Sequence, residues 1–350
     1  MASITSLLPS QIAALPTSSI AGLTTADITA MTTAQVAGFT SAQVAALGSA
    51  NVSALGTKAD SLTSTALKGL TSAEAGNLTT AAISGLTSAQ VAALTTAAVS
   101  GLAAEVTALD AAGISGLTSA QVVAISSANV SALGTNADGL TSAAIAGLSS
   151  AQVGALTPAA ISGLSSAQVA ALTPAGIAGL TTAQAAALNS ANTAQLAALS
   201  SAQIRALSAT SINALGTTDL TLLSSAQLGG LTSSQVAALG TSVLLLQSAP
   251  FAGISTNAIA GLTTATINAM TSANVALLTT AQVAALTSTE ISALGSAQIT
   301  SLTSAQISAL TSPEISALST AQIGYFTGSQ VQDFTSAQLA VMSTAQFNAL

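Results

Sequence analysis

The residues that could do chemistry in this sequence are ten acidic side chains, three cations and many Ser and Thr hydroxyls. Two carboxylates could act as a general acid and base, and an activated hydroxyl could act as a nucleophile. The chain has no His and no Cys, so the usual partners of a catalytic Ser or Thr are missing. Lys58 and Lys68 stand in no nucleophile motif. We therefore predict no enzymatic activity, no catalytic residues, no cofactor and no metal site.

The positions of the acids favour a structural role. Six of them replace a Gln that recurs about every eight residues: Asp27, Glu74, Glu105, Asp219, Glu290 and Glu314. Asp110 occupies a helix-capping position, and acids in a first helical turn favour the positive end of the helix dipole. Asp60 and Asp138 lie in "GTKAD" and "GTNAD", where one acid per turn without a Gly-rich calcium motif is a weak metal signal. Asp333 stands alone and is expected to be solvated.

Composition excludes several classes of protein. The formal net charge is −7, and Lys58, Lys68 and Arg205 are the only cations, so no basic face can neutralise nucleic-acid phosphates. Although 50% of the residues are hydrophobic, a Ser/Thr pair interrupts the chain about every eight residues. A transmembrane helix needs about 18 or more apolar residues in a row, so no membrane insertion is predicted. The start "MASITSLLPSQIAAL" shows no cleavable signal peptide.

One phrase of eight residues accounts for nearly the whole chain. Its consensus is Leu-[Thr/Ser]-[Thr/Ser]-Ala-Gln-[Val/Ile]-[Ala/Ser]-[Ala/Gly], as in "LTSAQVAAL" at residues 86–94. We call its first position the Leu slot and its sixth the Val slot. Thr87 is placed to cap a helix with Gln90 three residues later, which is a capping box. Leu86 and Val91 then occupy the two positions of a hydrophobic staple.

Each repeat is therefore predicted to form one capped helix of about two turns. Helices this short are unstable alone in water, so they must pack against neighbouring repeats. The alternative is a β-solenoid, but the apolar slots are five and three residues apart and do not alternate. We expect the Gln of each repeat to serve only the cap, which would make Glu equivalent to Gln at Gln168.

A longer period shows that the chain is one array. The phrase "TSAQVAALGSANVSALGTKADSL" returns with variation, and the blocks begin at 39, 117, 199 and 278. Each block holds ten short units. No linker or change of composition divides the blocks, so residues 1–350 are predicted to be a single continuous repeat array without a catalytic domain.

The expected architecture is an all-α solenoid with three or four repeats per superhelical coil. The Leu and Val slots would fill its axis, while the Ser/Thr pairs and Gln would line the outside. The five Phe residues fall in these slots and are expected in the core. The seven-residue units "GTKADSL", "AAEVTAL" and "GTNADGL" and the long unit "NSANTAQLAAL" should disturb the superhelix locally.

Two resemblances bear on function. The phrase "LTSAQVVAISSANVSAL" (117–133) resembles the first helix of the transcription-activator-like effector repeat, but the base-reading pair and the cationic stripe of that family are absent. The whole chain is similar to low-charge "LTTAQVAAL" arrays in bacterial surface and adhesin-like proteins. That resemblance implies an extracellular or surface-displayed protein: a rod-like spacer, stalk, or self-assembling filament or surface-layer subunit, with copies of itself and cell-surface components as partners. The alternative is a module that binds ice or a carbohydrate surface through its Thr/Ser arrays.

Overall fold

The fold consists of short helices and contains no strand in the residues that the structure describes. A computed structural model describes residues 4–190, 193–246 and 251–350. The all-α prediction is confirmed, and the β-solenoid alternative is wrong, since the apolar slots recur with the geometry of capped helical turns. No helix in these ranges has the length and hydrophobicity that crossing a lipid bilayer requires.

The chain divides into two compact units, Met1–Gly179 and Leu180–Leu350. In the first unit the helices, with 3-10 helices marked η, are η1 (Ile4–Ser6), α1 (Pro9–Ala13), α2 (Thr17–Ala21), α3 (Thr25–Ala30), α4 (Thr33–Val36), α5 (Ser41–Val44), α6 (Ser49–Ala54), η2 (Gly56–Ser61), α7 (Ser64–Leu67), α8 (Ser72–Ala75), α9 (Thr80–Ser84), α10 (Ser88–Ala93), α11 (Thr96–Leu102), η3 (Ala103–Ala108), α12 (Ala111–Ser115), α13 (Ser119–Ala124), α14 (Ser127–Ala132), η4 (Gly134–Gly139), α15 (Ser142–Ile145), α16 (Ser150–Ala155), α17 (Pro158–Gly163), α18 (Ser166–Ala171) and α19 (Pro174–Ile177).

The second unit continues in the same style. Its helices are α20 (Thr182–Ser190), α21 (Thr193–Ala197), α22 (Ser201–Ala206), α23 (Ala209–Asn213), α24 (Gly216–Leu220), α25 (Ser225–Leu228), α26 (Ser233–Leu239), η5 (Gly240–Leu245), α28 (Thr256–Ile259), α29 (Thr264–Ala269), α30 (Ser272–Ala276), α31 (Thr280–Val283), α32 (Ser288–Ser292), α33 (Ser296–Thr300), α34 (Ser304–Ala309), α35 (Ser312–Ala317), α36 (Thr320–Ile323), α37 (Gly328–Val331), α38 (Ser336–Ala340) and α39 (Thr344–Phe347). That the array runs without a break from one unit into the other stays a prediction.

Many of the α-helices begin at a capping box, as the sequence predicts. At α10 the Thr87 hydroxyl accepts a hydrogen bond from the Gln90 backbone N–H at 3.3 Å, and the Gln90 Oε1 accepts one from the Thr87 backbone N–H at 2.8 Å. Leu86 and Val91 are both buried beside this cap. The helix ends at Ala93, because the next Leu returns to extended backbone and starts the following repeat.

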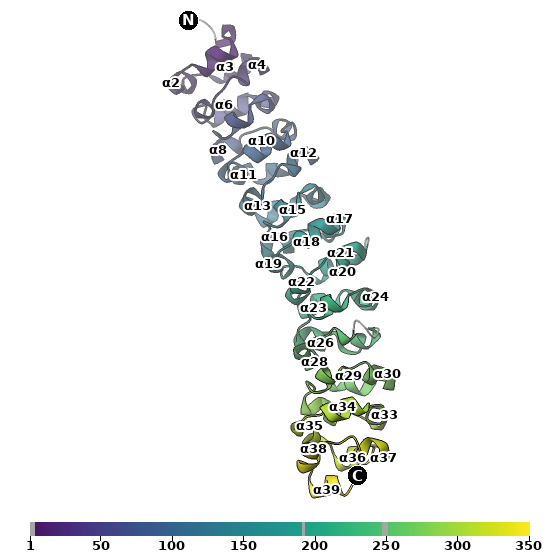
Figure 1. Ribbon diagram of the computed structural model, residues 1–350. Coiled ribbons are helices and arrows are strands. Elements are labelled where there is room, and N and C mark those ends of the chain that lie inside the picture. Colours follow the sequence, from purple (N-terminus) through teal and green to yellow (C-terminus); the bar gives the residue numbers. More distant parts are fainter. Residues whose placement is uncertain (1–3, 191–192, 247–250) are drawn as a thin grey trace. The chain divides into compact units, whose positions relative to one another are not determined.

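Within each unit the helices wind into stacked coils. Helices pack against the helix three repeats later, as α2 does against α5 and α32 against α35. The pair α16 and α19 can be followed in Figure 1. A coil therefore holds between three and four repeats, because side-chain hydrogen bonds join each helix to the fourth one before it. The Leu and Val slots point into the axis of the coil, and Val169 and Leu172 are 0% and 2% exposed.

The seven-residue units form 3-10 helices in place of α-helices. They are η2, η3 and η4, and each begins at a residue with positive φ: Gly56, Ala103 and Gly134. A 3-10 helix rises about 2.0 Å per residue, against 1.5 Å in an α-helix, so six residues span nearly the length of a full repeat. The predicted local disturbance is thus a change of helix type. The long unit "NSANTAQLAAL" lies partly outside the described residues.

Candidate functional site

The most regular polar feature of the structure is a row of buried Gln side chains between the coils. At Gln121 the Oε1 atom accepts a hydrogen bond from the Thr118 backbone N–H at 2.8 Å. The Nε2 atom donates to two carbonyl oxygens of the preceding coil, 2.8 Å away at Val91 and 2.7 Å away at Leu94. One amide thus hydrogen-bonds a backbone N–H at the start of its own helix and two carbonyl oxygens at the end of the helix four repeats earlier.

We call these side chains the glutamine row, and its members all donate Nε2 to carbonyls about 27 to 31 residues earlier. They are Gln35, Gln43, Gln90, Gln121, Gln152, Gln168, Gln227, Gln235, Gln282, Gln298, Gln306, Gln322, Gln330, Gln338 and Gln346. All of them are buried.

The expectation that the Gln side chains line the outside is therefore wrong. A helix of two turns leaves its last carbonyl oxygens without a partner inside the helix. Those carbonyls are buried under the next coil, where an unsatisfied polar group costs about 1–3 kcal/mol. The Gln amide supplies the missing donor. The expectation that Glu is equivalent to Gln at Gln168 rests on a side chain that serves only the cap. Gln168 Nε2 also donates to the Asp138 and Leu140 carbonyls, and a carboxylate has no donor for them.

Lys58 performs the same task in the 3-10 unit η2. Its ammonium group donates to the carbonyls of Ile28, Thr29 and Met31 at 3.2, 2.6 and 2.9 Å. Sequence reasoning found no role for this lysine. The three acceptors lie at the carbonyl end of α3, so the ammonium group satisfies the last carbonyls of that helix.

Asp27 and Glu74, two of the acids in the Gln position, have hydrogen-bonded carboxyl groups at their caps. Asp27 accepts from both the backbone N–H and the hydroxyl of Thr24, and these hydrogen bonds lower the pKa of its exposed carboxyl. Glu74 accepts through Oε2 from Thr71, and its Oε1 accepts from the Gly48 backbone N–H at 3.1 Å. Gly48 has φ 76°, a conformation that favours glycine, and its N–H replaces the carbonyl that a Gln would meet.

The remaining acids lie at helix starts or on the surface. Asp110 caps α12 through the Gly113 backbone N–H at 2.8 Å. Asp219 lies in the first turn of α24, where burial raises the pKa of its carboxyl, and Glu105 lies in the first turn of η3. Asp60 and Asp138 lie in η2 and η4. No three acidic side chains come together as a metal-holding group within the described part of the chain.

The Phe residues are buried in the apolar slots with one exception. Phe39, Phe251, Phe326 and Phe334 are buried, and the rings of Phe326 and Phe334 meet edge to face with centroids 5.0 Å apart. Phe347 is 57% exposed, so its predicted place in the core is wrong. It lies in α39, and no later coil among the described residues packs over it. Tyr325 is also exposed.

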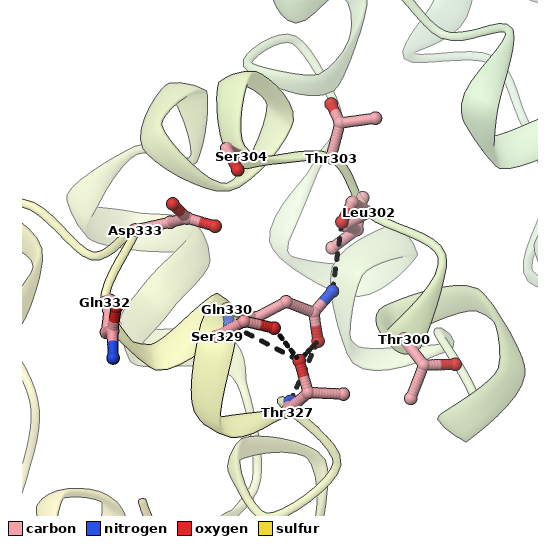
Figure 2. Close-up of a pocket in the computed structure, with 9 residues that line it drawn as sticks. All are labelled: Thr300, Leu302, Thr303, Ser304, Thr327, Ser329, Gln330, Gln332 and Asp333. Atoms are coloured by element: carbon pink, nitrogen blue, oxygen red, sulfur yellow. Dashed lines mark hydrogen bonds between the residues drawn. The ribbon is translucent and has the colours of Figure 1, made fainter.

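A shallow hollow between α33, α34 and α37 gathers several polar side chains. It has a volume of about 740 Å³, and Figure 2 shows its lining: Thr300, Leu302, Thr303, Ser304, Thr327, Ser329, Gln330, Gln332 and Asp333. Gln330 belongs to the glutamine row and is bonded to Thr327 and to the Leu302 carbonyl. The Thr327 hydroxyl is also 3.0 Å from the Ser329 hydroxyl. Asp333, predicted to be solvated, borders this hollow and is half-buried.

Comparison with known proteins identifies the repeat. Residues 20–57, 154–182, 212–242 and 278–312 match the ALTTAQ repeat. No curated protein and no solved structure matches the chain. The resemblances to bacterial adhesin-like proteins and to transcription-activator-like effectors are not confirmed by these matches. The chain is a repeat protein with four segments that match the ALTTAQ repeat.

Proposed function

We propose that this protein is a structural spacer: a rod-like stalk or filament subunit displayed outside a bacterial cell. The observation that carries the proposal is the glutamine row. Each coil binds the next through buried amide-to-carbonyl hydrogen bonds, in addition to the apolar contacts of the Leu and Val slots. Such an array grows by one coil at a time, and its stability is a sum over neighbouring coils.

The surface supports a place outside the cell. Only three side chains, Lys58, Lys68 and Arg205, offer a cleavage point to trypsin-like proteases. The Lys58 ammonium is bonded to three carbonyls, which restricts its access to such a protease. A chain with so few sites suits an environment rich in proteases.

The same surface supports self-association. Charged residues make up 4% of the chain, so copies that approach side by side meet little charge repulsion. Exposed Ala, Ser and Thr recur in every repeat. The proposed partners are therefore further copies of this chain, with components of the cell surface as a second partner.

Small-angle scattering and electron microscopy of the purified chain test the spacer. We expect an elongated particle. A variant in which residues 148–179 are duplicated should be longer by one coil, about 8–10 Å, at an unchanged cross-section. A globular particle, or a duplication that leaves the greatest dimension unchanged, contradicts the spacer. Sedimentation at rising concentration tests self-association separately, and a constant monomer mass contradicts it.

The alternative function is binding to ice or a carbohydrate surface. It is supported by the hollow of Figure 2, where Thr300, Ser304, Thr327, Ser329 and Asp333 present polar groups. The cap hydroxyls are bonded within their own helical turn, at Thr327 in this hollow as at Thr87. Thermal hysteresis and polysaccharide pull-down assays discriminate, because a spacer without this activity gives neither signal.

A further inference from the structure

Glu290 in α32 and Glu314 in α35 are buried acids that stand where the glutamine row has an amide. They are 3% and 2% exposed. Each accepts a hydrogen bond through Oε2 from the backbone N–H of its own cap residue, Thr287 or Thr311. The other oxygen, Oε1, is buried in both and has no hydrogen-bond partner among the described residues.

The flanking Gln side chains show what these oxygens face. Gln306 donates Nε2 to the carbonyls of Val275 and Leu278, 31 and 28 residues earlier. Gln282 and Gln322 use the same two offsets. The carbonyls at these offsets are those of Ile259 and Leu262 for Glu290, and those of Val283 and Leu286 for Glu314.

A carboxylate in this place sets its Oε1 atom against the carbonyl oxygens of the preceding coil. Both are acceptors, and no donor lies between them. Among the described residues no hydrogen bond is found to the Leu262 or the Leu286 carbonyl oxygen. Glu74 avoids the conflict, because the Gly48 N–H turns toward its Oε1. No equivalent donor reaches Glu290 or Glu314.

We propose that Glu290 and Glu314 are proton-operated joints, in which each carboxyl holds a proton on Oε1 and its O–H donates a hydrogen bond to a carbonyl oxygen of the preceding coil. A protonated Glu then bonds in the manner of a Gln, with one donor in place of two: it accepts at its own cap and donates across the coil. Loss of the proton removes the donor and leaves a buried charge facing carbonyl oxygens. Acid therefore tightens these two joints, and neutral pH loosens them.

The proton fits this place better than a metal ion. At Gln322 the amide nitrogen lies 3.1 Å from the Ile291 carbonyl oxygen and 2.9 Å from the Leu294 carbonyl oxygen. Each distance leaves room for a hydrogen atom between the two heavy atoms and for nothing larger. A dehydrated cation needs about 2.0–2.6 Å to each of two oxygens and would force the coils apart.

The surroundings favour the protonated form. Burial raises the pKa of Glu290 and of Glu314, while the hydrogen bonds from their caps oppose the rise. The charge of Glu314 raises the pKa of Glu290 further. The helices packed against them, α29 on one side and α38 on the other, carry no titratable side chain. Among residues 251–350 the other titratable side chains are Tyr325 and Asp333.

The direction of the pH effect follows from these pKa values. Each folded pKa lies above the ordinary value of 4.5. The stabilisation is therefore fully present below about pH 4.5 and is lost as the pH rises through the raised pKa. Each unit of pKa rise corresponds to about a tenfold change in the local opening equilibrium.

Hydrogen exchange of the full chain at several pH values tests the proposal, with peptides covering residues 256–318 as the readout. After correction for intrinsic rates, protection there should fall at least severalfold between pH 4.5 and pH 7.5. The double variant Glu290→Gln, Glu314→Gln carries permanent donors and should keep its protection at both pH values. Infrared spectra at pH 5 should show a carboxylic-acid C=O band that the double variant lacks.

Glu74→Gln is the matched control. The new amide would point a donor at the Gly48 N–H, so this variant should lose protection near residues 48–76 and leave the pH response of 256–318 unchanged. The proposal is overturned if the parent and the double variant show the same pH profile at 256–318. It is equally overturned if the carboxylic-acid band is absent from the parent.

Discussion

The side-chain amide nitrogen of Gln168 lies 2.6 Å from the carbonyl oxygen of Leu140, 28 residues earlier in the chain. The same nitrogen bonds the Asp138 carbonyl at 2.7 Å, and Gln168 Oε1 accepts from the Ser165 backbone N–H. This single side chain thus connects two successive coils through two hydrogen bonds and also closes the cap of its own helix.

Replacing Gln168 with Glu should destabilise the coil joint at neutral pH. The carboxylate keeps the cap but loses both donors, and the buried carbonyls are left unsatisfied. We expect a loss on the order of 2–3 kcal/mol in the local free energy of unfolding, measured by hydrogen exchange. Gln11→Glu is the control, because Gln11 is exposed and, among the described residues, its side chain bonds only its own cap. Equal effects of the two substitutions would argue against the joint.

Leu172→Asp should destabilise the array by several kcal/mol, because it buries a charge without a partner in a slot that is 2% exposed. Val123→Asp introduces the same group at a position that is 58% exposed and should be close to neutral. Thermal melts followed by far-UV circular dichroism compare the two. A harmless Leu172→Asp would show that the Leu slots do not form the core.

Gly116→Ala should be strongly destabilising. A Cβ atom at Gly116 would lie 2.3 Å from the backbone oxygen of Ser88 in the preceding coil, so the two helices would have to separate. At Gly22 the new Cβ would lie 3.6 Å from its nearest neighbours, and Gly22→Ala should be neutral or slightly stabilising, since alanine favours helix. If urea titrations give both variants the same shift, the close approach at Ser88 is not tight.

Ala103→Gly should stabilise the chain by about 1 kcal/mol. Ala103 has φ 48° and ψ −125°, a conformation that strongly favours glycine, and the corresponding residue at the start of η5, Gly240, is a glycine. Ala104→Gly in the same 3-10 helix gains no such relief and should be destabilising. The midpoint of thermal unfolding is the measurement, and a lower midpoint for Ala103→Gly would contradict the prediction.

Asp27 should show the opposite pH response to Glu290. Hydrogen bonds from Thr24 lower its pKa below 3.8, so its contribution to stability is present above that pH and is lost as the pH falls through the lowered pKa. An NMR titration of the Asp27 carboxyl carbon gives the pKa directly. Asp27→Asn should retain the cap, because Asn274 bonds Thr271 in the same way. A normal or raised pKa at Asp27 would contradict this.

Local features of the fold could be predicted from the sequence because they depend on neighbours within five residues. Thr87, Gln90, Leu86 and Val91 form the cap and the buried pair that their spacing indicates. The second partner of each Gln could not be predicted in this way. It lies 27 to 31 residues away, and its identity depends on how many repeats complete a coil. The close approach at Gly116 escaped prediction for the same reason, since Ser88 belongs to the preceding coil.

The 3-10 units have a consequence for how such a gene can change. Gln43 reaches carbonyls 31 and 28 residues back, whereas Gln152, whose coil includes the shorter η4 unit, reaches carbonyls 30 and 27 residues back. In both cases these are the carbonyls of a Val slot and a Leu slot, so pairing follows the repeat and not the residue count. A copying error that removes one residue can be absorbed as a 3-10 turn. One that adds or removes a whole octad moves a Gln opposite the Val-slot and Leu-slot carbonyls of another repeat, so recombination between repeats can alter the length of the protein while keeping this type of contact.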